Sequence, residues 1–127
     1  MTSQPETRRK FKVYFAEASA KFRRFSHEAH VYATWRMLQD APALTALAEF
    51  RRGLREIAQT SGKADKYHET LTVAWFLLVL ERRRAGETWE DFITRCPELL
   101  NAGLVDQFYG FNVMRDDQAR REFIAPQ

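Results

Sequence analysis

The sequence predicts a single-domain, all-α fold: a bundle of about five to seven helices around one central apolar helix. Three observations support this prediction. Apolar residues recur at helical spacing through most of the 127 residues, the 5 Gly and 4 Pro leave long uninterrupted segments, and no stretch requires a sheet. The 10 Phe and 3 Trp provide enough bulk for a sizeable core at this length.

The N-terminal part is expected to be a short tail followed by a helix. We expect residues 1–7 to form a flexible tail and residues 8–127 to form one helical domain. Aromatic side chains recur at helical spacing over 8–25, which predicts the first helix. Apolar residues also alternate over 10–15, so a strand is the competing interpretation there.

The next two helices carry recognisable start signals. Ser26 is a suitable cap for a helix over about 27–39, because its hydroxyl can accept from an orphan backbone N–H group. Asp40 is expected to cap a third helix, with Pro42 in its first turn. That helix is expected to end near Ser61.

The fourth helix is predicted over about residues 65–84 and should be the centre of the bundle. Its run from Leu71 to Leu80 leaves no polar face, so we expect burial on all sides. Ten such residues are too few to span a bilayer. Shorter helical segments are expected at 89–96, after Thr88, and then from Pro97, at 104–109 and at 116–124.

Composition excludes several classes of protein. The single cysteine, Cys96, rules out an internal disulfide and every multi-cysteine zinc or iron–sulfur motif. The N-terminus lacks the apolar core of a secretory signal, and no segment is a membrane span, so a cytoplasmic location is expected. The formal charge is +3, and the basic clusters are interpreted as solvated helix faces. Nucleic acid is not an expected partner, because no recognisable nucleic-acid motif accompanies them.

The three histidines lie in two short segments and carry the functional hypothesis. His27 and His30 are three residues apart, so both fall on the apolar side of the second helix. On the fourth helix, His68 and Glu69 are expected to point with apolar neighbours. A carboxylate in that direction is costly unless it is paired or bound to a metal.

Our first hypothesis is a small metal-dependent enzyme acting on a small polar or anionic metabolite. His27, His30, His68 and Glu69 would bind a divalent metal, either iron or zinc. Glu69 would be the fourth ligand or the general base, and Tyr67 and Thr72 would support it. The bound metal would act as a Lewis acid or activate a water or oxygen.

Three alternatives remain open. In the first, no metal is involved, and two helix N-termini with the histidines and Lys66 bind a carboxylate or phosphate, as in a lyase, an isomerase or a binding protein. In the second, the histidines are hydrogen-bonded core residues and Glu69 pairs with Lys66 or an arginine. In the third, a non-enzymatic interaction or nucleic-acid-binding module uses basic faces such as 51–55. A homodimer formed by exchange of the N-terminal segment is also open.

The segments F-S-H-E-A-H-V, from residue 25, and K-Y-H-E-T, from residue 66, resemble signature segments of a group of small bacterial all-helical proteins. The resemblance covers roughly residues 25–85. It implies that His27, His30, His68 and Glu69 are the residues that matter, and it implies no particular reaction.

Overall fold

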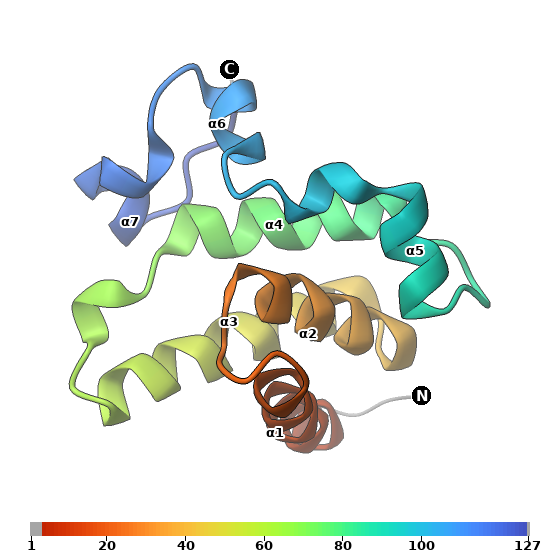
Figure 1. Ribbon diagram of the computed structural model, residues 1–127. Coiled ribbons are helices and arrows are strands. Elements are labelled where there is room, and N and C mark those ends of the chain that lie inside the picture. Colours follow the sequence, from red (N-terminus) through yellow and green to blue (C-terminus); the bar gives the residue numbers. More distant parts are fainter. Residues whose placement is uncertain (1–3, 127) are drawn as a thin grey trace.

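The computed structural model describes residues 4–126, and these residues form seven α-helices and three short 3-10 helices with no β-strand (Figure 1). The all-α prediction is therefore confirmed. In chain order the elements are α1 (Gln4–Lys21), α2 (His27–Asp40), α3 (Ala43–Thr60), η1 (Ala64–Lys66), α4 (Glu69–Arg82), α5 (Trp89–Arg95), η2 (Pro97–Leu100), α6 (Leu104–Tyr109), η3 (Val113–Arg115) and α7 (Asp117–Arg121).

Helix α4 lies between two groups of helices. On one side it packs against α2 and α3, and α1 packs across both of these (Figure 1). On the other side it contacts α6, η3 and α7. The start of α4 is therefore the point where the N-terminal three-helix layer meets the C-terminal elements. Within the described part of the chain, none of the helices is long and apolar enough to cross a membrane.

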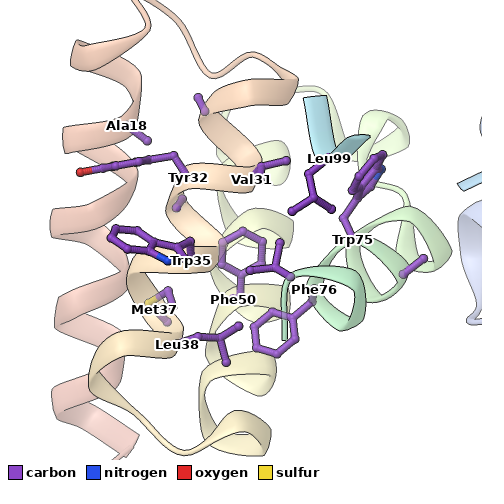
Figure 2. Packing of buried hydrophobic residues seen from close by; sticks show 14 of the residues in the cluster. Ala18, Val31, Tyr32, Trp35, Met37, Leu38, Phe50, Trp75, Phe76 and Leu99 are labelled. Atoms are coloured by element: carbon purple, nitrogen blue, oxygen red, sulfur yellow. The ribbon is translucent and has the colours of Figure 1, made fainter. Parts of the chain in front are cut away.

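The core is rich in aromatic side chains from α2, α3, α4 and α5. Phe50, Phe76 and Phe92 are fully buried, and the Trp35 ring stacks on Phe92 with 6.3 Å between ring centroids. Figure 2 shows Trp35 near Phe50, and Trp75 beside Leu99. Helices α1 and α3 approach closely at Gly53, where an added Cβ would lie 2.2 Å from Cε2 of Phe11. A glycine is required here because no space remains for a side chain.

The capping signals at two helices are confirmed. Ser26 Oγ accepts from the Ala29 N–H at 3.2 Å, and Thr88 Oγ1 accepts from the Asp91 N–H at 3.1 Å. Each hydroxyl satisfies a backbone donor that has no partner inside its helix.

The N-terminal boundary differs from the prediction. Helix α1 starts at Gln4, so residues 4–7 of the expected tail are helical, and Thr7 is buried. Residues 1–3 of that tail lie outside the described residues. The alternative of a strand over 10–15 is wrong, because these residues are inside α1.

Other boundaries also need correction. Asp40 is the last residue of α2 and does not cap α3, which follows Pro42. Helix α4 begins at Glu69 and not near residue 65, because η1 and an extended Tyr67 precede it. The helix is also not buried on all sides, since Leu77 is 43% exposed.

Candidate functional site

His68 is the N-cap of α4 rather than a residue of its first turn. Its Nδ1 accepts from the Leu71 N–H at 3.1 Å, and its Nε2 lies 2.9 Å from the Val113 carbonyl oxygen. A nitrogen that accepts carries no proton, and a carbonyl can only accept, so the ring is neutral with its proton on Nε2. Burial lowers the pKa of His68, which favours this neutral form. Both ring nitrogens are therefore already engaged.

His27 is the first residue of α2 and is hydrogen-bonded to η2. Its Nε2 donates to the Leu99 carbonyl oxygen at 2.8 Å and links α2 to η2. The ring packs edge-on against Trp75, with 4.3 Å between ring centroids. It lines a shallow hollow with Ser26, Glu28 and Leu100 of η2, whereas His68 lines a different cleft.

His30 differs from the other two histidines because its Nε2 is covered and has no hydrogen-bond partner among the described residues. The ring lies between Phe25 and Phe50, with centroid distances of 5.9 and 5.3 Å. Burial, and secondarily the proximity of His27, lowers the pKa of His30 to about 4. The imidazole is therefore neutral at physiological pH.

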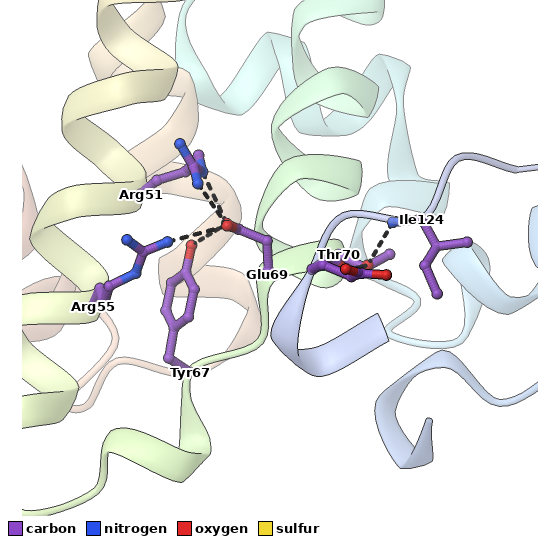
Figure 3. A network of polar contacts seen from close by, with 7 residues as sticks. Arg51, Arg55, Tyr67, Glu69, Thr70 and Ile124 are labelled. Atoms are coloured by element: carbon purple, nitrogen blue, oxygen red, sulfur yellow. Dashed lines mark hydrogen bonds and ion pairs between the residues drawn. The ribbon is translucent and has the colours of Figure 1, made fainter. Parts of the chain in front are cut away.

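Glu69 is surrounded by donors from α3 and from the residue before His68 (Figure 3). Arg51 donates to its two carboxylate oxygens at 2.8 and 2.5 Å, and Arg55 donates at 3.1 Å. The Tyr67 hydroxyl donates at 2.7 Å. Hydrogen bonding from Arg51 lowers the pKa of Glu69 in spite of burial.

The contacts around Glu69 favour a structural role over proton transfer. A carboxylate held by two guanidinium groups and a phenol is a weak base, and its oxygens are occupied. Burial and the hydrogen bond to Glu69 raise the pKa of Tyr67 to about 12, so its hydroxyl stays protonated. Three donor contacts from Arg51 and Arg55 thus join α3 to the start of α4.

A half-open cleft of about 780 Å³ lies where the N-terminal layer meets η1, the start of α4 and α7. Its walls are mainly apolar: Phe15, Phe25, Leu54, Ile57, Leu71 and Met114. The polar groups inside it include His30, Tyr67, His68 and Thr72. Of these, only His30 combines a covered ring nitrogen with the lack of any described partner.

The structure therefore brings together some of the predicted site residues and separates others. His30, His68, Tyr67 and Thr72 line one cleft, whereas His27 does not line it and Glu69 faces the arginines of α3. In the described part of the chain, no three His, Cys, Asp or Glu side chains are grouped so that they could hold a metal ion. The metal-dependent enzyme thus stays a prediction without geometric support.

The partners of Glu69 were not identified individually from the sequence. Arg51 and Arg55 are four residues apart and so lie on one face of α3, which is the available signal for a shared partner. Residues 51–55 also carry the alternative of an exposed basic binding face. Arg52 on this face forms salt bridges with Glu49 at 2.8 Å and with Glu56 at 2.6 Å. The interpretation that pairs Glu69 with an arginine agrees with these contacts.

Comparisons with protein-family models, with curated proteins and with solved structures give no match for this chain. The resemblance to the small bacterial all-helical proteins therefore stays a prediction.

Proposed function

We propose that the protein binds a small organic molecule with an apolar body in the cleft between α3, η1 and the start of α4. The main support is His30. His30 is a neutral imidazole beside an apolar cleft, and its Nε2 is covered and has no partner among the described residues. It can give a ligand one oriented hydrogen bond when the ligand displaces the neighbouring side chains that cover this nitrogen. This is the metal-free interpretation of the histidine segments.

The other polar groups of the cleft act as supports. His68 fixes the start of α4 and holds the Val113 region against it. Glu69 connects that start to α3 through Arg51 and Arg55. These contacts give the cleft a defined shape before a ligand arrives. A preformed cleft loses less conformational entropy on binding than one that must first be ordered.

A neutral fragment tests this proposal. We would titrate 3-phenylpropanamide into ¹⁵N-labelled protein and follow the backbone amide shifts. A fragment of this size is expected to bind with a dissociation constant of about 1 mM. The shifts should be confined to amides around the cleft, and His30→Leu should weaken binding about fivefold by removing one hydrogen bond.

A matched pair of variants locates the binding. Ala58 lines the cleft in the last turn of α3, so Ala58→Phe should obstruct part of it and reduce the shifts. Ala20 is exposed in the last turn of α1, and Ala20→Phe should leave them unchanged. Absent shifts in the wild type, or equal shifts in a folded Ala58→Phe protein, would overturn the proposal.

A further inference from the structure

We infer that the ligand of this cleft is an organic anion, with its charged group at the mouth and its apolar body against the aromatic walls. This inference rests on the proposed function and names the class of ligand. It starts from the charges that line the cleft, which come from two separate elements: Lys63 and Lys66 around η1, and Arg120 on α7.

The two lysines are held next to each other by the backbone. The Lys66 N–H donates to the Lys63 carbonyl oxygen at 2.8 Å, and the Lys63 N–H donates to the Ala58 carbonyl oxygen at 2.7 Å. These bonds tie η1 to the end of α3. Both lysines are exposed, and neither has a carboxylate within salt-bridge distance among the described residues. Their charges are therefore available at the mouth of the cleft.

The remaining charges at the cleft are consistent with a net positive mouth. Among the described residues, Asp65 is the one carboxylate that lines the cleft, against the three cations Lys63, Lys66 and Arg120. Arg120 is partly neutralised, because it donates to Asp117 at 2.7 Å. His30 contributes no charge at physiological pH. A preference for a negatively charged ligand must therefore come from Lys63 and Lys66. The interior of the cleft offers only apolar contacts and neutral polar groups.

This distribution matches a two-part ligand. Phe15, Phe25 and Leu71 can contact an alkyl or aryl body, which gains by leaving water. An ammonium group is a compact point charge on a flexible stem, so two lysines attract an anion without fixing its geometry. The cleft thus favours an organic anion such as an aryl or alkyl carboxylate over a neutral molecule of the same shape.

The test compares 3-phenylpropanoate with 3-phenylpropanamide, which differ in charge but hardly in size. At low ionic strength we expect the carboxylate to bind about tenfold more tightly, since each exposed ion pair contributes modestly. Added salt should bring the ratio of the two dissociation constants toward unity, because it screens exposed charges. Lys63→Gln/Lys66→Gln should abolish the preference and leave binding of the amide unchanged.

A control with the same change in net charge is Lys12→Gln/Lys21→Gln on α1, outside the cleft. It should retain the preference. If the amide binds but the carboxylate has no advantage, the inference is overturned and the proposed function stands. A preference that survives loss of Lys63 and Lys66 also overturns it. If neither probe binds in the cleft, the proposed function fails first.

Discussion

His30 makes the stability of the protein depend on pH in a way that can be measured. Burial lowers its pKa to about 4 in the folded protein, from an ordinary value of 6.5. As the pH falls below 6.5, the unfolded chain takes up a proton at this imidazole and the folded protein does not. Acid therefore favours unfolding, and the free energy of unfolding decreases between pH 6.5 and pH 4.

The size of the effect follows from these two pKa values. Proton linkage at this one group gives a loss of about 2 kcal/mol in the free energy of unfolding between pH 7 and pH 5. The pKa values of Glu49, Glu69 and His68 are also lowered in the folded protein. Protonation of these groups therefore also lowers the free energy of unfolding as the pH falls. Only a comparison with a variant that lacks the His30 imidazole isolates its share.

The variant is His30→Leu, which keeps an apolar side chain between Phe25 and Phe50. Urea unfolding at pH 5, 6 and 7 should show the wild type losing about 2 kcal/mol more than this variant across the range. Exposed Lys12→Gln should follow the wild type. The role of burial would be refuted if the free energies of unfolding of the wild type and of His30→Leu changed equally with pH. It would also be refuted if His30 of the folded protein titrated near 6.5 by NMR.

Three further changes test the packing around the cleft. Gly53→Ala forces a methyl group onto the buried Phe11 ring and should lower stability by about 1–3 kcal/mol; an unchanged Tm would contradict the close approach. Glu69→Gln removes the charge that two partly exposed arginines share and should cost about 1–2 kcal/mol in chemical unfolding, and no loss would mean that the cluster is not a tie. Thr70→Val removes the hydroxyl that accepts from the Ile124 N–H at 3.1 Å, so hydrogen exchange at that amide should accelerate while the core amides stay protected (Figure 3).

The helices could be predicted from the sequence because their signals are local. Ser26 and Thr88 mark helix starts through their own hydroxyls, and periodic apolar residues mark the faces between them. The error at His68 shows the limit of this approach. The helical period predicts a direction only for a residue inside a helix, whereas His68 caps α4 from an extended conformation, with φ −125° and ψ 108°. Its direction therefore did not follow from the helical period.

Glu69 shows why the site could be predicted only in part. The sequence indicated correctly that a carboxylate at the start of an apolar helix needs a partner, because its burial is costly. A metal ion, a lysine and an arginine are all suitable partners for such a carboxylate, and the linear sequence does not distinguish between them. The choice is made by the packing of α3 against α4, which brings Arg51 and Arg55 to the carboxylate from 18 and 14 residues away. Because these donors occupy its oxygens, Glu69 has little capacity left to bind a ligand, whereas His30 lines the cleft with an Nε2 that has no partner among the described residues.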